Sequence, residues 1–164
     1  MPRAFPAPGR LLLSAWTRLA PLPFGRHLFS WVVGQMAPYT GTVGGRYVVV
    51  RPGFVQVELR DRRRVRNHLA SVHAIALVNL AEMTSGVALL TALPAGIRGI
   101  VTGLSITYHK KARGRLLCET TAEAPNAIAA PMDHDVIATI TDQAGDAVAT
   151  CTVHWRLSPP EPTA

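Results

Sequence analysis

The chain has 164 residues, a length at which one domain encloses a single hydrophobic core. Hydrophobic residues make up 48% of it and charged residues 16%, which excludes an intrinsically disordered chain. The formal net charge is +7, and 15 of the 17 Lys and Arg residues are arginine. This charge is compatible with nucleic acid, an anionic membrane, an acidic carrier protein or a phosphorylated cofactor, and equally with a GC-rich coding sequence. Charge alone therefore selects no partner.

Residues 1–39 are predicted to form an N-terminal helical extension. Residues 1–9 are rich in proline and predicted to be irregular, whereas residues 10–36 predict two helical pieces separated by "PLPF" at 21–24. Arg18 cuts the apolar run soon after it begins, which argues against a secretion signal. Packing on the rest of the chain is the preferred interpretation of this extension, and peripheral membrane association stays open.

The middle of the chain predicts a β-hairpin followed by one long helix. The hairpin strands are predicted at residues 42–50 and 54–60, joined by the turn pair Pro52-Gly53. The helix is predicted over residues 71–92, with Ser71 as its N-cap. Because this helix is apolar nearly all round, it is expected to be enclosed by other structure, and its polar residues argue against a membrane span.

Four further strands are predicted after the helix, at residues 99–110, 115–124, 133–141 and 147–157. The order of helix, two strands, long helix and four strands is typical of an α+β domain with an antiparallel sheet. A six-stranded sheet wrapped around one buried helix is the simplest such architecture. Residues 159–164 are predicted to be a disordered tail.

The cysteines and histidines give no sign of a metal site. Cys118 and Cys151 are too few for a disulfide framework and lack metal-ligand spacing, so they are interpreted as buried strand thiols of a cytoplasmic protein. Asp133-His134-Asp135 is interpreted as a strand-entry turn, because adjacent residues of a strand point to alternating faces. No metal is predicted.

Glu82 is the one formally charged residue between Arg66 and Arg98, in the most apolar run of the chain. An ionised carboxylate is rarely buried without a partner, because it loses its hydration. Periodicity alone favours a buried structural hydrogen bond for Glu82, made with Asn67 or a backbone amide. A functional carboxylate is the alternative.

The segment "NHLASVHAIALVNLAEMTSG" at 67–86 resembles the hotdog-fold thioesterase superfamily, in particular the phenylacetate-pathway and hydroxybenzoyl-CoA types. In that pattern an amide residue precedes a His-Gly-Gly by six positions, and an acidic residue follows the histidine by nine. Asn67, His73 and Glu82 match these spacings, while Ala74 and Ile75 replace the two glycines. The strand order supports the resemblance, which implies a hotdog domain over residues 40–158 in an uncharacterised branch.

The resemblance implies an acyl-CoA thioesterase whose catalytic residues are Glu82, Asn67, His73 and Ala74. The Ala74 N–H would bind the thioester oxygen, Asn67 would orient water or the carbonyl, and Glu82 would act as general base or nucleophile. Ala74 and Glu82 are about 12 Å apart along a helix axis. The resemblance therefore also implies a homodimer, or a dimer of dimers, with sites shared between subunits.

Two basic clusters are candidates for binding the phosphates of coenzyme A. Lys110, Lys111 and Arg113 lie where family members often hold the cofactor, and they are favoured over "RDRRRVR" at 60–66. The substrate is expected to be an acyl-CoA or an acylated carrier protein, with no other cofactor.

Two competing hypotheses remain. A hotdog module that binds acyl chains or acyl-CoA without hydrolysis is suggested by the loss of the paired glycines. A basic nucleic-acid-associated protein is suggested by charge alone, and it is disfavoured because no aromatic residues interleave the basic clusters.

Overall fold

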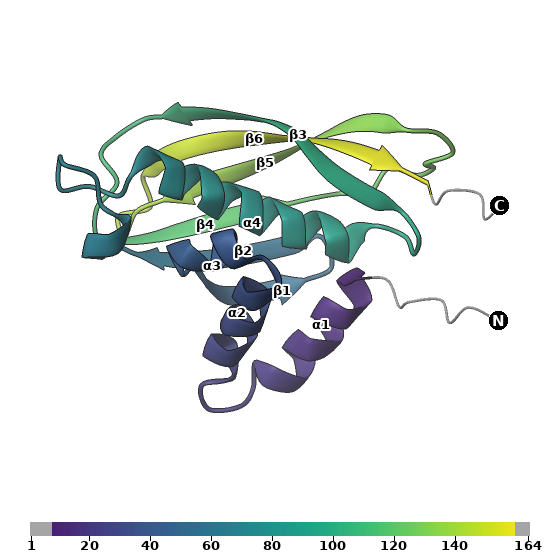
Figure 1. The fold of residues 1–164 in the computed structure, drawn as a ribbon, viewed down its shortest axis with the longest axis horizontal. Helices are drawn as coiled ribbons and strands as arrows, with labels where there is room; N and C mark the ends of the chain where they lie inside the picture. The colour runs from purple at the N-terminus through teal and green to yellow at the C-terminus, as the bar shows by residue number, and fades with distance from the viewer. Residues whose placement is uncertain (1–7, 160–164) are drawn as a thin grey trace.

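A computed structural model of the chain describes residues 8–159. Three helices precede the first strand pair, one long helix follows it, and four strands complete the fold (Figure 1). The elements are α1 (Pro8–Leu19), α2 (Gly25–Met36), α3 (Pro38–Val43), β1 (Arg46–Arg51), β2 (Phe54–Arg60), the 3-10 helix η1 (Arg63–Val65), α4 (Ala74–Ala92), β3 (Arg98–Tyr108), β4 (Arg115–Thr121), β5 (Met132–Thr141) and β6 (Ala147–Ser158).

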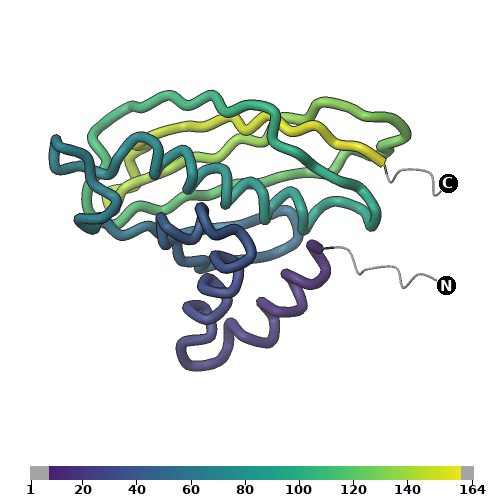
Figure 2. Tube along the Cα trace, viewed as in Figure 1, coloured from purple at the N-terminus to yellow at the C-terminus, as the bar shows by residue number. Residues whose placement is uncertain are grey.

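The six strands form one antiparallel sheet in the order β1-β2-β4-β5-β6-β3, and α4 lies along one face of it (Figures 1 and 2). This is the predicted α+β architecture, with the hotdog arrangement of one long helix against an antiparallel sheet. The tail predicted at 159–164 falls, except for its first residue, outside the described residues. Of the irregular segment predicted at residues 1–9, residues 1–7 also lie outside the described residues, whereas Pro8 and Gly9 are helical.

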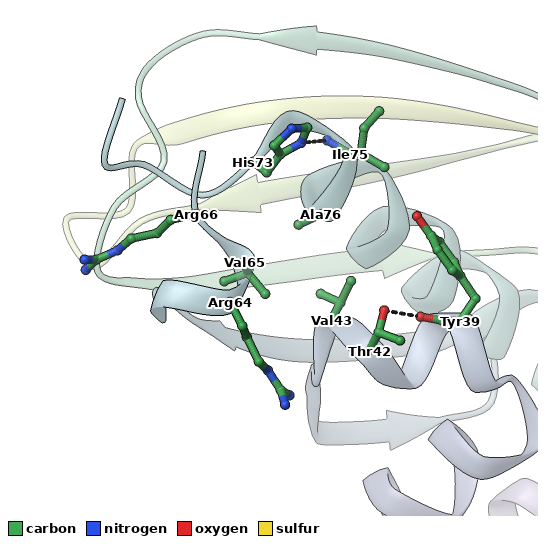
Figure 3. A pocket seen from close by; sticks show the side chains of 9 residues that line it. All are labelled: Tyr39, Thr42, Val43, Arg64, Val65, Arg66, His73, Ile75 and Ala76. Carbon is green, nitrogen blue, oxygen red and sulfur yellow. Dashed lines mark hydrogen bonds between the residues drawn. The ribbon is translucent and has the colours of Figure 1, made fainter. Parts of the chain in front are cut away.

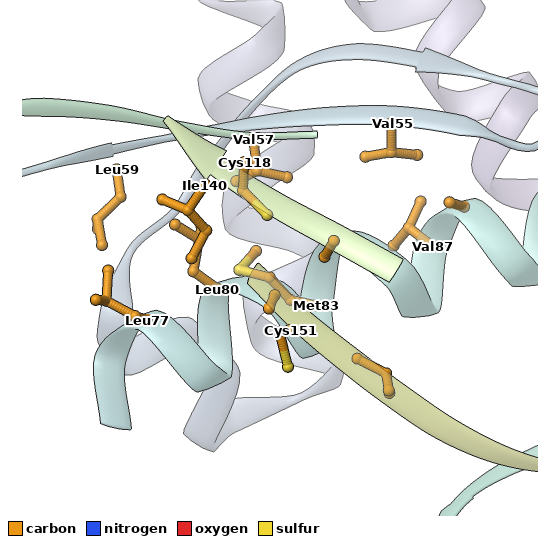
Figure 4. Packing of buried hydrophobic residues seen from close by; sticks show 14 of the residues in the cluster. Val55, Val57, Leu59, Leu77, Leu80, Met83, Val87, Cys118, Ile140 and Cys151 are labelled. Carbon is orange, nitrogen blue, oxygen red and sulfur yellow. The ribbon is translucent and has the colours of Figure 1, made fainter. Parts of the chain in front are cut away.

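Apolar residues of α4 and of the sheet form the core (Figure 4). Leu80 and Ala81 are fully buried and pack with Val57, Cys118 and Ile140 of the strands. Both cysteines are free and buried, as predicted. α4 is long and apolar enough to cross a membrane, yet 67% of that window is buried inside the protein, as in the core helix of a globular fold.

The start of α4 differs from its prediction. The helix begins at Ala74, and its N-cap is His73, whose Nδ1 accepts a hydrogen bond from the Ile75 N–H at 3.1 Å. Ser71 is not the cap because it belongs to the preceding loop, where its N–H and hydroxyl both donate to Asn67 Oδ1. An imidazole acceptor replaces the hydroxyl that the sequence suggested.

Two polar positions of the sheet were also predicted incorrectly. Glu58 alternates with Val57 and Leu59 along β2, a pattern that predicts a solvated side chain, but it is 7% exposed and lies 3.1–3.5 Å from Arg46, Arg60 and Arg115. Burial works to raise the pKa of Glu58, but these arginines outweigh it and lower that pKa below its usual value. Asp133–Asp135 lies within β5, not in a turn.

The N-terminal helices pack against the end of α4 and the first strand. Trp16, Phe29 and Tyr47 form a chain of edge-to-face ring contacts, with centroids 5.1 and 5.4 Å apart. Gly9 of α1 sits so close to α4 that an added Cβ would lie 1.9 Å from the Leu90 carbonyl oxygen. Helix α3 was not predicted: residues 42 and 43 were assigned to a strand, but they close this helix before Gly44 turns the chain with a φ of 68°.

Candidate active site

One stripe of α4 escapes burial. The half-buried or exposed positions of this helix recur every fourth residue at Ala74, Val78, Glu82, Gly86 and Leu90, with Ile75 and Ala92 beside them. Residues four apart lie on the same side of an α-helix. Glu82 therefore lies at the middle of the only strip of α4 that is open to solvent or to a ligand.

Glu82 faces a pocket of about 420 Å³ between this stripe, α3 and β3. Its walls are mainly apolar and include Val78, Val101 and Leu104. The Glu82 carboxylate is half-buried and forms no hydrogen bond or ion pair with any of residues 8–159. The predicted structural bond to Asn67 is absent, and Ser85 donates to the Glu82 backbone carbonyl, not to the carboxylate.

Burial raises the pKa of Glu82 above its ordinary value. No cation lies close enough to Glu82 among the described residues to offset this effect. Tyr47, which is buried beneath α4 and donates to the Met83 carbonyl, has its own pKa raised first by burial and then by the negative charge of Glu82. Glu82 is thus a more basic carboxylate than one in water.

The raised pKa predicts a pH-dependent effect of Glu82 on stability. Between the unfolded and folded pKa values the folded chain holds a proton that the unfolded chain has lost, so stability falls as pH rises through that window. Glu82→Gln is therefore expected to be more stable than the natural protein at about pH 8 and equally stable at about pH 3.5. Urea unfolding at both pH values measures this difference. A Glu82→Gln variant that is less stable at pH 8 would contradict it.

Asn79 lies one turn before Glu82 and lines the same pocket. The side chain is 7% exposed, and its Oδ1 is fully enclosed without a hydrogen-bond partner in the described part of the chain. Buried carboxamides are nearly always hydrogen-bonded, because an unmet polar group costs about 1–3 kcal/mol. The pocket thus holds two polar groups, Asn79 and Glu82, that the fold itself leaves unsatisfied.

The helix start lies next to this pocket. His73, Ile75 and Ala76 line a second, open pocket of about 680 Å³, which shares Tyr39 and Ile75 with the Glu82 pocket (Figure 3). The His73 ring is occupied in capping Ile75, and Tyr108 Oη donates to the Ala74 carbonyl at 3.2 Å. The Ala74 N–H has no acceptor among residues 8–159, so it is available to a ligand.

Asn67 orders the loop that leads into α4. Its Oδ1 accepts from the Leu69 N–H at 2.9 Å, from the Ser71 N–H at 3.3 Å and from the Ser71 hydroxyl at 3.2 Å. Asn67 lines neither the Glu82 pocket nor the helix-start pocket. The structure thus places His73 in the helix-start pocket and Glu82 in the adjoining one, whereas Ala74 and Asn67 line neither.

The three basic residues predicted to bind phosphates, Lys110, Lys111 and Arg113, differ in their surroundings. Lys110 is held by Asp142 at 2.6 Å and Asp146 at 2.8 Å, whereas Lys111 and Arg113 are exposed and form no ion pair within the described chain. Their loop lies beside the helix start, because the Val72 N–H donates to the Ala112 carbonyl.

Arg64 and Arg66 lie at the rim of the helix-start pocket with their side chains extended outward (Figure 3). Arg66 is paired with Asp61 at 2.6 Å, and Arg64 is exposed. The sequence analysis named both basic clusters and favoured the Lys110–Arg113 group over the one that contains Arg64 and Arg66, and it missed Tyr39 and Leu104 in the pocket walls. The period of the strand around Leu104 is hidden by a register shift between Val101 and Gly103.

No group of three or more His, Cys, Asp or Glu side chains in residues 8–159 is arranged to hold a metal ion. The Glu82 pocket instead offers one carboxylate and one carboxamide on an apolar background, and the free Ala74 N–H lies at the helix start beside it. This set suits the binding of a carbonyl group and the activation of water or direct nucleophilic attack.

Residues 25–157 match the model of the family described as "Domain of unknown function (DUF4442)". The chain belongs to this family. The match begins at α2 and ends in β6, so it contains the whole groove, whereas α1 precedes it. A search of the curated proteins found no match.

Solved structures share the fold across most of the chain. The protein called genomics APC5556 is 28% identical, with a TM-score of 0.78, covering 91% of this chain and 99% of its own. PA5026 from Pseudomonas aeruginosa, described as "Probable Thioesterase", is 22% identical, with a TM-score of 0.72 and coverage of 84% and 97%. Thioesterase HI1161 from Haemophilus influenzae is 11% identical, with a TM-score of 0.66 and coverage of 79% and 90%. These likenesses identify the fold as the hotdog fold.

Proposed function

We propose that the protein is a thioester hydrolase that acts on an acyl-CoA or an acylated carrier protein, with Glu82 as general base or nucleophile. The observation that carries this proposal is the pocket carboxylate of Glu82, which burial makes more basic and which no described residue binds. The thioesterases among the neighbours of the same fold support it.

As a general base, Glu82 takes a proton from water, the resulting hydroxide attacks the thioester carbon, and the thiolate leaves and is protonated. As a nucleophile, Glu82 attacks the same carbon, expels the thiolate and forms an anhydride, which water then hydrolyses. Both routes give a carboxylic acid and a free thiol. The apolar walls favour either route, because they keep the carboxylate poorly hydrated.

Among residues 8–159 of a single subunit, no backbone N–H is known to lie close enough to Glu82 to stabilise the oxyanion that forms during the reaction. The free Ala74 N–H lies about 12 Å from Glu82 along the helix axis. We therefore include a homodimer in the proposal, with Ala74 of one subunit beside Glu82 of the other. β3 supports this arrangement, because it is an edge strand of the described sheet and exposes Leu104 and Tyr108.

Purified protein incubated with a panel of acyl-CoAs and a thiol reagent tests the proposal. We expect release of free coenzyme A from at least one thioester, in proportion to enzyme concentration. A panel spanning short, long and aromatic acyl groups that yields no thiol above the uncatalysed rate would refute hydrolysis. A cytoplasmic location belongs to the same proposal, since acyl-CoA is its substrate.

A binding module without hydrolysis is the second candidate, and Ile75 favours it. Ile75 occupies the position of a family glycine and is 54% exposed, at the junction of the two pockets. A bulky side chain there narrows the approach to the Ala74 N–H. Saturable acyl-CoA binding without thiol release would select this alternative.

A further inference from the structure

A further cavity of about 750 Å³ lies between the N-terminal helices, the end of α4 and the start of β3. It is lined almost wholly by apolar side chains, and Arg98 at its edge is the one charged residue among its walls. Representative lining residues are Leu12, Ala15, Val33, Met36, Leu90 and Ile97.

The walls of this cavity are firmly held. Gly9 brings α1 into backbone contact with Leu90, and a side chain at that position would separate the two helices. On the other side, the Phe29 ring packs between Trp16 and Tyr47, which ties α1 and α2 to the core. The cavity is therefore a built part of the fold and not a gap between loose helices.

The cavity lies farther along α4 than the Glu82 pocket, and the two are lined by different residues. Leu90, in its wall, is on the open stripe of α4, two steps beyond Glu82 and about 12 Å along the axis. Gly86 occupies the step between them, and the Trp155 ring packs against the helix there, because a Cβ added at Gly86 would lie 3.4 Å from that ring. Met36 at the end of α2 lines the cavity, and Tyr39 at the start of α3 lines the Glu82 pocket, so these two consecutive helices each border one of them.

The groove is also polarised along α4. Arg64 and Arg66 rim the first pocket, Glu82 lies in the middle, and the apolar cavity lies at the far end of α4. A molecule with an anionic head, a central thioester and a hydrocarbon tail complements this order, whereas a polar peptide does not.

We propose that the cavity between α1, α2 and the end of α4 binds the hydrocarbon chain of the acyl group, so that the protein selects medium-chain to long-chain acyl thioesters. The assignment rests on the proposed function only for the identity of the head group. It gives the N-terminal helices a role in substrate selection, including α1, which lies outside the residues that match the family.

Binding of butyryl-, octanoyl- and palmitoyl-CoA to the full chain, measured by calorimetry with Glu82→Gln to prevent turnover, tests this assignment separately from catalysis. Each methylene that enters the cavity is expected to tighten binding about fourfold, the fold-change equal to about 0.8 kcal/mol. Ala15→Phe places a ring in the cavity and is expected to abolish the advantage of palmitoyl-CoA over octanoyl-CoA. Ser14→Phe, with the same ring on an exposed neighbouring position of α1, is the matched control.

Met36→Asp is the second variant, because Met36 is 74% exposed at the cavity rim and tolerates a charge without repacking. It is expected to weaken palmitoyl-CoA binding and to leave butyryl-CoA binding unchanged. Affinity that does not depend on chain length, or equal effects of Ala15→Phe and Ser14→Phe, would overturn the proposal. A change in oligomeric state for Ala15→Phe alone, seen by sedimentation, would overturn it too, because the occupant would then be a second copy of the chain.

Discussion

Glu82→Gln is expected to lower kcat/KM for acyl-CoA hydrolysis by about 10²–10⁴-fold, the usual contribution of a general base or more. Glutamine keeps the size of the side chain but accepts no proton and attacks no carbonyl. Because Glu82 makes no hydrogen bond or ion pair with the described residues, the substitution breaks no contact that holds the fold. Steady-state kinetics with the best substrate of the panel gives the ratio.

Glu123→Gln is the matched control, since Glu123 is an exposed carboxylate outside the groove, and its kcat/KM is expected to match that of the natural protein. The pH profile supplies a second measure. The raised pKa of Glu82 places the acid limb of kcat/KM above the ordinary glutamate range, and that limb is expected to vanish with the variant. A Glu82→Gln enzyme of unchanged activity would exclude Glu82 from the chemistry and leave the acyl-binding alternative.

The fold followed from the sequence because its signals are local and agree with one another. The long apolar run around Leu80 predicts a buried helix, and the turn pair Pro52-Gly53 fixes the hairpin. The errors arose at residues whose environment is determined by contacts with residues that are distant in the sequence. Glu58 looks like a solvated strand residue until three arginines from β1, β2 and β4 surround it. His73 and not Ser71 caps α4, because the Ser71 hydroxyl donates to Asn67 in the preceding loop.

The candidate site was predictable only in part, for the same reason. The spacing from Asn67 to Glu82 identified the carboxylate, but not the groove that surrounds it. That groove depends on Tyr39 from α3 and Leu104 from β3, which are far away in the sequence and carry no chemical signature. The resemblance also implied that Asn67 lies near the reaction, whereas its oxygen is engaged in the loop before α4. The role proposed for it from the resemblance stays a prediction.

The position of Ala74 and Glu82 on α4 bears on the proposal that two subunits share one active site. The helical spacing alone puts Ala74 and Glu82 too far apart to act on the same thioester group, unless a second subunit brings its Ala74 beside Glu82. The structure adds that both lie on one stripe of α4. Under the proposed function, one subunit would hold the ligand along this stripe and its partner would complete the oxyanion site. Hydrolysis and chain selection then depend on different residues, and variants of Glu82 and of Ala15 separate them.

Asn79→Leu is expected to stabilise the protein by about 1–3 kcal/mol while it lowers kcat/KM by about two- to tenfold. The gain arises because Asn79 is buried without a hydrogen-bond partner for its oxygen, so the natural fold carries an unmet polar group that leucine removes. The loss arises because the carboxamide lines the Glu82 pocket, where it can bind a water or a thioester oxygen. Urea unfolding and steady-state kinetics give the two quantities.

Asn126→Leu, the same substitution on an exposed loop, is expected to change stability by less than about 0.5 kcal/mol and to leave kcat/KM unchanged. The opposed signs at Asn79 separate a functional group from a structural one. A structural carboxamide would lose stability on substitution, and activity would fall only with the folded fraction. If Asn79→Leu destabilises the chain, its carboxamide is satisfied within the protein, and the second polar group of the pocket then belongs to the fold and not to the substrate.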